Sequence, residues 1–286
     1  MRLQVYHRTE YLYPEAVSDS RNELRLTPKS TPRQEVESSL IYVLPATKLS
    51  SYKDLNYNRV HHFTIPNPHQ RLLIESRFTV RTQQQVDMAA LPYGFLLEDL
   101  PSCSQSEECH PFLQGSAYIE ITPEIWREAI DIRGDARDVF QISYAIMEHI
   151  YMNYDYVAGA TNAMTHANEA IRKRTGVCQD FAHAMVALCR SLKIPARYVS
   201  GYFYDSTRNH SLRGSEASHA WVEVYTGAAG WVGLDPTNRK VIDNTYIILA
   251  IGRDYRDVAP VIGSYYGRGG SALNIHVQVQ RLKDNA

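Results

Sequence analysis

The stretch Thr175-Gly-Val-Cys-Gln-Asp-Phe181 places Cys178 at the start of a segment with helical periodicity. From Cys178 to Leu192, apolar side chains recur every three or four residues, which predicts an amphipathic helix facing a core. The first turn of a helix presents unpaired backbone N–H groups, whose partial positive charge favours the thiolate, the form of cysteine that attacks carbonyl carbons. Cys178 is therefore a candidate nucleophile, whereas Cys189, on the same stripe, is interpreted as packing.

A hairpin is predicted downstream of this helix. The stretch Ala217-Ser-His-Ala-Trp-Val-Glu-Val-Tyr225 alternates so that His219, Trp221 and Glu223 share one face of a strand. A glycine-bounded turn follows, and Trp231-Val-Gly-Leu-Asp235 indicates a return strand that stops before a proline. Adjacent antiparallel strands lie about 5 Å apart, so local pairing can bring His219 and Asp235 together. Contact with Cys178 requires the helix to pack across the sheet.

Four separated blocks resemble, in the same order, the transglutaminase-like superfamily, and specifically its bacterial members. The blocks are Gly176–Ala182, Ile194–Gly201, Ser218–Glu223 and Trp231–Thr237. The extended opening segment and Ile251–Pro260 are similar to the long bacterial form with a β-rich amino-terminal domain. The resemblance implies an α+β fold with a papain-like core, in which helices pack on an antiparallel sheet. It also implies a triad that maps without departure onto Cys178, His219 and Asp235.

The implied chemistry is attack on the amide of a peptide or protein substrate. Cys178 would attack the carbonyl, His219 would pass the proton to the leaving amine, and Asp235 would fix the imidazole tautomer. Water would resolve the resulting thioester as a peptidase or deamidase does, whereas a primary amine would give transglutaminase cross-linking. A third hypothesis is a binding or scaffold protein with an idle triad. We favour hydrolysis.

The tetrahedral oxyanion of such a reaction needs hydrogen-bond donors. The backbone N–H of Cys178 at the helix start is the natural first donor. Relatives in the family use a side chain upstream of the cysteine for the second, and Tyr154, Tyr156 and Asn162 lie in that part of the chain. The sequence does not choose among them.

Other residues near these motifs have simpler interpretations. Asp180 is interpreted as structural, since a negative charge so near would oppose formation of the thiolate. Trp221 and Trp231 are expected to fill the core or shield the triad. The charged block Arg253-Asp-Tyr255 either walls the cleft, as a similar block in relatives suggests, or forms a solvated turn.

The chain divides into three predicted parts. Residues 1–85 are rich in extended segments interrupted by prolines and are expected to form a β-sandwich. Residues 86–118 are rich in turn formers and are expected to be a connector or lid. Residues 119–286 are expected to form the transglutaminase-like core, which begins with helices near Thr122 and Ala136.

Composition limits the possible partners. The 286 residues are 44% hydrophobic and 21% charged, with a formal net charge of −1. The basic footprint of a nucleic-acid binder is absent, and no apolar run is long enough for a membrane span. The first residues alternate like a strand and not like a signal peptide, so the cytoplasm is expected, and the oligomeric state is left open. Cys103, Cys109 and His110 do not match a zinc pattern, so neither a metal nor a cofactor is expected.

Overall fold

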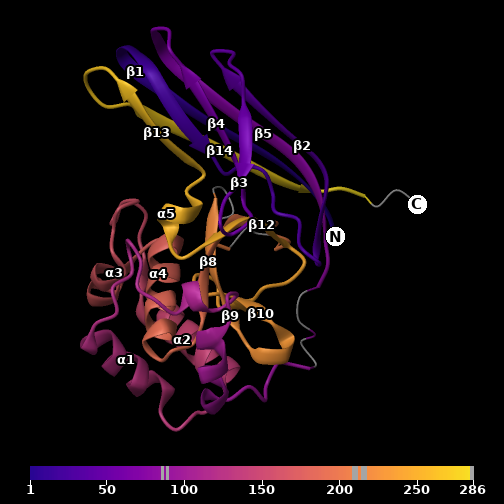
Figure 1. Cartoon of the computed structure of the whole chain (residues 1–286), viewed down its shortest axis with the longest axis vertical. Coiled ribbons are helices and arrows are strands. Elements are labelled where there is room, and N and C mark those ends of the chain that lie inside the picture. The colour runs from indigo at the N-terminus through magenta and orange to yellow at the C-terminus, as the bar shows by residue number, and fades with distance from the viewer. Residues whose placement is uncertain (85–86, 88–89, 208–211, 214–217, 284–286) are drawn as a thin grey trace.

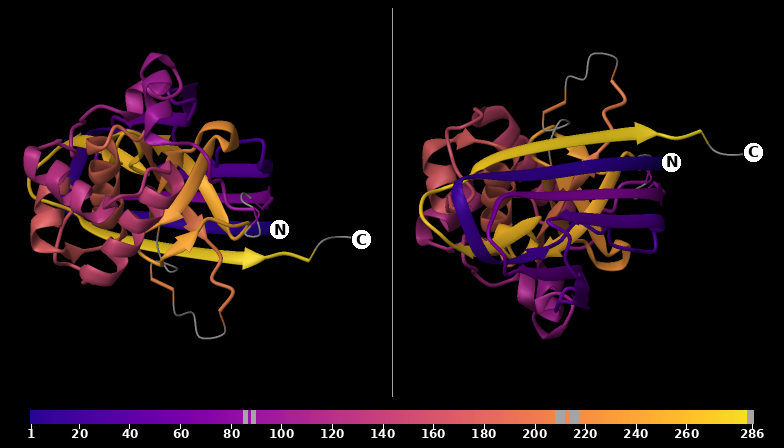
Figure 2. Two further views of the ribbon diagram at one scale, coloured as in Figure 1. Left: turned by 90° about the horizontal axis from the view of Figure 1, so that it is seen from below. Right: turned by 90° about the horizontal axis from the view of Figure 1, so that it is seen from above.

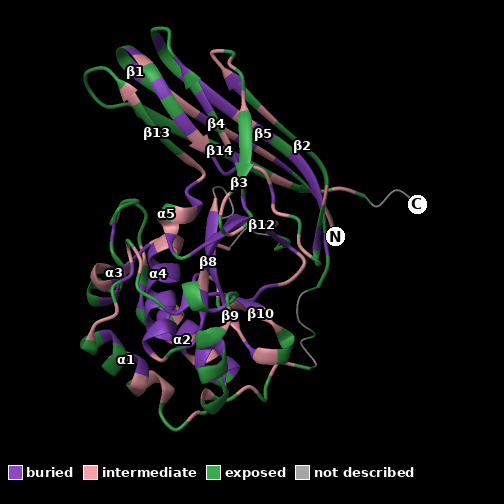
Figure 3. Cartoon of the chain, viewed as in Figure 1, coloured by how far each residue is buried: buried purple, intermediate pink, exposed green. Residues whose placement is uncertain are grey.

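The computed structural model shows a curled β-sheet stacked on a mixed core of helices and strands (Figure 1). The structure describes residues 1–84, 87, 90–207, 212–213 and 218–283. In the core, buried residues concentrate on α4 (Cys178–Ser191) and on the strands beside it, whereas much of the curled sheet is exposed (Figure 3). The α+β class expected from the sequence is confirmed.

One long strand organises the amino-terminal sheet. The first half of β1 (Arg2–Leu24) pairs with β5 (His69–Thr82) and β14 (Ala272–Arg281). Its second half pairs with β4 (Arg59–Ile65) and β13 (Val261–Tyr266). The register of β1 against β5 shifts between Leu12 and Val17, where the strand bends. The sheet therefore curls around β1, as the views from above and below show (Figure 2).

The remaining strands of this sheet lie at its edges. β2 (Gln34–Leu44) pairs with β5, and β3 (Ser50–Lys53) pairs with β4, which completes a single seven-stranded sheet. The two halves of β1 thus belong to two sets of paired strands, β2, β5 and β14 on one side and β3, β4 and β13 on the other, which share β1 in one curled sheet. β13 and β14 also correct the expected extent of the core, residues 119–286, because these carboxyl-terminal strands pair with β1.

The connector between the two parts packs against the core. It contains two short 3₁₀ helices, η1 (Leu97–Gln105) and η2 (His110–Phe112). Cys103 and Cys109 are free thiols on this segment, and both are buried. The expected boundary at residues 85–86 lies outside the described residues.

The core sheet has five antiparallel strands in the order β11-β10-β9-β8-β12. The predicted hairpin is confirmed as β9 (His219–Tyr225) and β10 (Trp231–Asp235), joined through η3 (Gly227–Ala229). The other strands of this sheet are β8 (Ala196–Phe203), β11 (Lys240–Val241) and β12 (Tyr246–Gly252). A separate parallel pair, β6 (Asp155–Tyr156) and β7 (Thr175–Gly176), lies just before α4.

Side-chain caps start the first two helices, and the second begins at Val139, three residues after the expected Ala136. Thr122 accepts a hydrogen bond from the backbone of α1 (Pro123–Arg133), and Asp138 does the same for α2 (Val139–Asn153). Two shorter helices are α3 (Ala167–Lys173) and α5 (Tyr255–Val258). The α4 helix begins at Cys178, as the sequence predicts.

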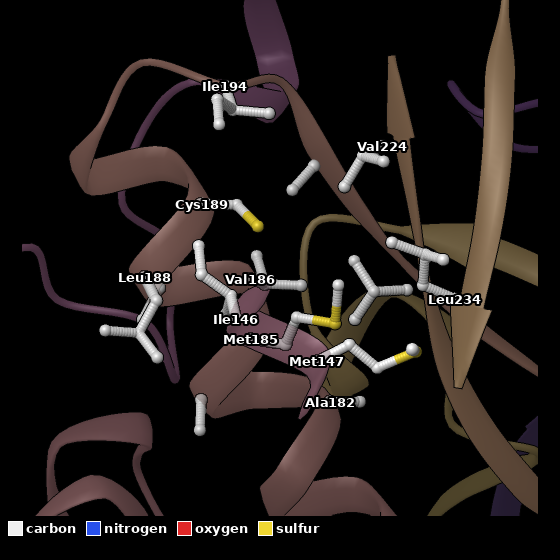
Figure 4. Close-up of a cluster of buried hydrophobic side chains, with 14 of the residues drawn as sticks. Ile146, Met147, Ala182, Met185, Val186, Leu188, Cys189, Ile194, Val224 and Leu234 are labelled. Carbon is white, nitrogen blue, oxygen red and sulfur yellow. The ribbon is translucent and has the colours of Figure 1, made fainter. Parts of the chain in front are cut away.

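The α4 helix is the centre of the core. Met185, Val186 and Cys189 are fully buried and point toward the sheet residues Val224 and Leu234 (Figure 4). Burial of one such side chain contributes about 1.5–3 kcal/mol. This packing holds the amino end of α4 in a fixed position relative to β9, as the sequence interpretation requires.

The two sheets share a hydrophobic cluster and several hydrogen bonds. Tyr202 of β8 and Leu249 of β12 pack in the same cluster as Leu3 and Val5 of β1. The Gln34 side chain accepts the backbone N–H of Ile248 and donates to its carbonyl, both at 2.8 Å. The amino-terminal sheet is therefore fastened to the core sheet at β8 and β12.

Candidate active site

Cys178 differs from the other cysteines in exposure. It is the first residue of α4 and is partly exposed, whereas Cys103, Cys109 and Cys189 are buried. Burial raises the pKa of both Cys109 and Cys189 to about 12, so their thiolates are strongly disfavoured. Cys178 is thus the thiol that a substrate can reach.

Asp180 fixes the start of this helix. Its Oδ2 atom accepts the Val177 backbone N–H at 2.8 Å and the Thr161 hydroxyl at 2.6 Å. Burial raises the pKa of this carboxyl, although the two hydrogen bonds oppose the shift. A Cβ atom added to Gly176 would lie 2.5 Å from Asp180 Oδ2 and 2.6 Å from its Cβ. The glycine before Cys178 is therefore required by the close approach of this capping carboxylate.

His219 and Asp235 meet at the end of the hairpin. His219 is the first residue of β9 and Asp235 the last of β10, so antiparallel pairing brings them to the same end of the sheet. The His219 Nε2 atom lies 2.8 Å from Asp235 Oδ2, and both side chains are fully buried. The predicted local contact is confirmed.

Asp235 accepts hydrogen bonds from other groups besides His219. Its Oδ2 atom also accepts the Tyr246 hydroxyl at 2.9 Å and the Asn238 side-chain N–H at 2.9 Å. Its Oδ1 atom accepts the backbone N–H groups of Thr237 at 2.8 Å and Asn238 at 3.3 Å. Despite the opposing effect of burial, the charge on His219 and these hydrogen bonds lower the pKa of Asp235. The carboxylate is therefore ionised and fixed in orientation.

The charge balance around His219 favours its protonated form. Burial alone would lower its pKa, but the Asp235 carboxylate and interactions with the neighbouring Cys178 side chain outweigh that effect and raise the pKa to about 10. The second ring nitrogen, Nδ1, is buried and has no hydrogen-bonding nitrogen or oxygen within the described part of the chain. Nε2 is occupied by Asp235, so Nδ1 is the nitrogen available to the thiol.

One of the three proposed oxyanion donors lies beside the cysteine. Tyr156 on β6 pairs with Gly176 on β7, two residues before Cys178. Burial, followed by the charge of the Cys178 thiolate, raises the pKa of Tyr156 to about 12. By contrast, the nearest charges that act on Tyr154 are Glu128 and Arg174.

Asn162 has a local role. Its side-chain oxygen accepts the Met164 N–H at 2.8 Å, and its own N–H donates to Thr165 Oγ1 at 3.1 Å. These bonds stabilise the turn before α3. Of the two tyrosines, Tyr156 is the one whose pKa is affected by Cys178.

In the block Arg253-Asp-Tyr255, expected either to wall the cleft or to form a solvated turn, the arginine makes the ion pair of a solvated turn. Tyr255 feels the charge of the Cys178 thiolate, although burial is the main cause of its raised pKa. The Arg253 guanidinium is 52% exposed and pairs with Asp257 at 2.8 Å. Asp254 is buried and accepts the backbone N–H groups of Tyr118 and Arg256, both at 2.9 Å.

The two tryptophans differ in burial. Trp221 is fully buried, with its ring centroid 6.3 Å from that of His219, so it shields the histidine. Trp231 is partly buried, and the Arg197 guanidinium lies 4.1 Å from its ring centroid.

Tyr246 and Asn238 are site residues that the sequence interpretation missed. Asn238 follows Asp235 by three residues in Asp-Pro-Thr-Asn, a turn-forming pattern that could have indicated it. Tyr246 gives no such signal, because it reaches Asp235 from β12, an edge strand that β8 and β9 separate from β10.

Two properties of the described residues bear on other kinds of site. Across the described ranges, no group of three or more histidine, cysteine or acidic side chains is arranged to hold a metal ion. Nor does any described helix combine the length and apolar character needed to span a membrane.

A partly exposed cysteine at a helix start, facing a buried histidine–carboxylate pair on an antiparallel sheet, defines a cysteine-dependent enzyme. Residues 129–236 match the transglutaminase-like superfamily, and residues 3–81 match the bacterial transglutaminase-like N-terminal region. An uncharacterized protein of Mycobacterium leprae is 33% identical over 285 residues, which cover 98% of this chain and 99% of the relative. The chain belongs to the transglutaminase-like superfamily.

Two further similarities concern proteins with a stated activity. A crystal structure of a protein described as a candidate cysteine protease from Cytophaga hutchinsonii superposes with a TM-score of 0.80 and 26% identity. The match covers 100% of this chain and 92% of that one. A protein-glutamine gamma-glutamyltransferase of Pseudomonas aeruginosa is 39% identical over 67 residues, covering 22% of this chain and 10% of the relative.

Proposed function

We propose that the protein is a cysteine-dependent amide hydrolase, a peptidase or deamidase, that acts through a thioester on Cys178. The observation that carries this proposal is the buried His219–Asp235 pair at 2.8 Å, which keeps the imidazole protonated next to the partly exposed thiol. An imidazolium stabilises a thiolate nucleophile and has a proton ready for the leaving amine.

Cys178 and His219 carry the bond and proton changes of the reaction. The Cys178 thiolate attacks the amide carbon, and the carbonyl electrons move to the oxygen. The oxyanion is stabilised by the Cys178 backbone N–H and, as we assign it, by the Tyr156 hydroxyl, whose raised pKa keeps it a donor. On collapse, the C–N bond breaks and the His219 imidazolium protonates the amine. Neutral His219 then takes a proton from the water that attacks the thioester. The C–S bond breaks, the carboxylic acid leaves, and the imidazolium and the thiolate are restored.

The first test is the reactivity of Cys178. In the wild-type protein at neutral pH, iodoacetamide should modify Cys178 much faster than Cys103, Cys109 or Cys189, because burial disfavours at least two of the competing thiolates. Site-resolved mass spectrometry gives the four rates. Equal slow rates would favour the third hypothesis, a scaffold protein with an idle triad.

The second test identifies the reaction. The protein is exposed to a peptide library, quenched in acid, and the mass added to Cys178 identifies the acyl group. Release in the presence of a small primary amine then separates the two enzymatic outcomes. We expect free acid as the main product, and predominant amine incorporation would instead establish cross-linking.

Cross-linking is the second candidate because of the short match to a protein-glutamine gamma-glutamyltransferase. The same three residues would form the same thioester, and only the nucleophile that resolves it would change. The match covers a small part of both proteins, whereas the similarity to the candidate cysteine protease spans the whole chain. Hydrolysis therefore remains the favoured function.

A further inference from the structure

A large pocket lies where the amino-terminal sheet, the connector and the core meet. Its volume is about 900 Å³. The loop after β1 supplies Lys29, the connector supplies Phe112, and the core strands supply Arg197, Trp231 and Tyr246. Cys178, His219 and Asp235 do not line it. Clefts of this size between domains are common ligand sites.

One wall of the pocket is apolar and built from aromatic rings. Phe112 and Trp231 meet edge to face, with their ring centroids 5.4 Å apart. Ile248 and Ile251 of β12 extend this surface. Such a wall accommodates the apolar part of a ligand at little cost in ordering, because the rings are already packed against each other.

A fixed cation lies beside this wall. The Arg197 guanidinium donates to Glu223 Oε2 through Nε at 2.7 Å and approaches the same oxygen through Nη2 at 2.6 Å. Glu223 is only 2% exposed, and the Trp231 ring lies against the other side of the guanidinium. The arginine is therefore held in place before any ligand arrives, and its charge is balanced by Glu223.

A second cation in the pocket has no acidic partner. The Lys29 ammonium is partly buried and donates to the Asn56 carbonyl at 2.6 Å, and it forms no ion pair with any described residue. Burial and repulsion from Arg197 lower its pKa to about 8, although Asp54 and Glu223 partly oppose this. Because these carboxylates do not form an ion pair with the partly buried ammonium, an anion placed next to Lys29 would be favoured.

The acidic residues of the pocket do not supply that counter-charge. Glu108 accepts the Trp231 indole N–H at 2.6 Å, and Asp243 pairs with Lys240 at 3.3 Å. Glu107 is exposed on the connector. The pocket is thus lined by the cations Lys29, Arg33 and Arg197 and by these three acidic residues and Glu223, none of which forms an ion pair with Lys29 in the described part of the chain.

We propose that this pocket binds a small organic carboxylate, whose acid group pairs with Lys29 beside Arg197 and whose apolar body packs against Phe112 and Trp231. The ligand would touch the amino-terminal sheet and the core at once. It would also lie against Tyr246, whose hydroxyl donates to Asp235. Tyr246 therefore belongs both to the pocket and to the residues that hold Asp235 in the candidate active site. The site does not depend on the proposed reaction.

Isothermal titration calorimetry with two matched probes tests the site. The probes are 2-naphthoate and its neutral analogue 2-naphthamide, and the protein is Cys178→Ala, which prevents turnover of the amide. We expect naphthoate to bind at least tenfold more tightly than naphthamide at pH 7. Lys29→Met in the same background should abolish this preference, and Lys29→Arg, which keeps the charge, should retain it.

Lys48→Met is the matched control, because this lysine also belongs to the amino-terminal part but does not line the pocket. It should leave the preference for naphthoate unchanged. Because Lys29→Arg keeps the charge but changes the side chain, retained preference in this variant shows that the loss in Lys29→Met comes from the charge and not from misfolding. Equal affinity for the two probes, absence of saturable binding, or an unchanged preference in Lys29→Met would each overturn the proposal.

Discussion

His219 in the core and His7 in the amino-terminal sheet are both fully buried, yet His219 is protonated and His7 is neutral. His219 contacts the Asp235 carboxylate, and its pKa is raised to about 10. His7 contacts only hydroxyls, Tyr202 at 2.6 Å and Thr9 at 2.7 Å, and burial lowers its pKa to about 4. Burial therefore makes a histidine neutral unless a fixed carboxylate reverses the effect. One environment supports acid–base chemistry, and the other joins two sheets.

Removing the carboxylate should erase this difference and have the largest effect. Asp235→Asn leaves His219 with a neutral partner, as at His7, so its pKa should fall and the thiolate should lose its counter-ion. We expect hydrolysis to slow by about 10³- to 10⁴-fold, as for the loss of the equivalent charge in other triads. Turnover of the substrate found in the library measures this, and alkylation of Cys178 should slow in parallel.

Asp257→Asn is the matched control for that variant. Asp257 pairs with the exposed Arg253, and its loss should leave the alkylation rate within twofold of the wild type. If Asp235→Asn retained full turnover, the assigned role of the carboxylate would be wrong.

The two histidines should also give opposite dependences of stability on pH. The folded-state pKa of His7 lies below its unfolded value of about 6.5, so its contribution is complete above pH 6.5 and is lost as the pH falls toward about 4. This loss amounts to about 3 kcal/mol at pH 4. Urea unfolding at pH 7.5 and pH 4 should therefore show a smaller drop in stability for His7→Gln than for the wild type.

The folded-state pKa of His219 lies above its unfolded value, so the sign is reversed. Its contribution is complete below pH 6.5 and is lost as the pH rises through about 10. Urea unfolding at pH 7.5 and pH 10 should show less alkaline loss of stability for His219→Gln than for the wild type. If stability changed with pH in the same direction for both variants, the assigned charge states of the two histidines would be wrong.

Removing one of the hydrogen bonds that hold Asp235 should have a smaller effect. Tyr246→Phe removes one hydroxyl donor at 2.9 Å while keeping the ring that packs on Phe203. Loss of one hydrogen bond to a charged group costs about 1.5–3 kcal/mol in stability, and we expect about a tenfold lower kcat with little change in KM. The pKa of Asp235 should rise, so the acid limb of the kcat profile should move to higher pH. Tyr42→Phe, an exposed tyrosine on β2, is the control.

The smallest effect is expected at the charged block before α5. Arg253→Ala removes an exposed ion pair, so turnover should stay within twofold and stability within about 0.5 kcal/mol. Tyr255→Ala should lower turnover more, because Tyr255 lies in the field of the Cys178 thiolate. Turnover assays and urea unfolding of both variants measure this. A large loss in Arg253→Ala would place the arginine in the site.

Residue patterns over short distances were sufficient for a large part of the fold. The periodicity of α4 predicted its start at Cys178, and the alternation around Trp221 predicted the β9–β10 hairpin. Because the two strands of a hairpin are close in sequence, the same alternation also predicted the His219–Asp235 contact. Resemblance to the family related this pair to Cys178, which the structure places beside it.

The remaining features depend on contacts between distant parts of the chain. The pairing of β13 and β14 with β1, the approach of Tyr246 to Asp235, and the pocket at Lys29 were not predicted. The physical reason is that periodicity shows which face of an element is buried, but the backbone hydrogen bonds of a strand edge accept many partners. Residue types and their spacing were enough to identify the side chains that could do chemistry. Which charges face one another depends on the folded chain, and this is why His219 is protonated while His7 is neutral.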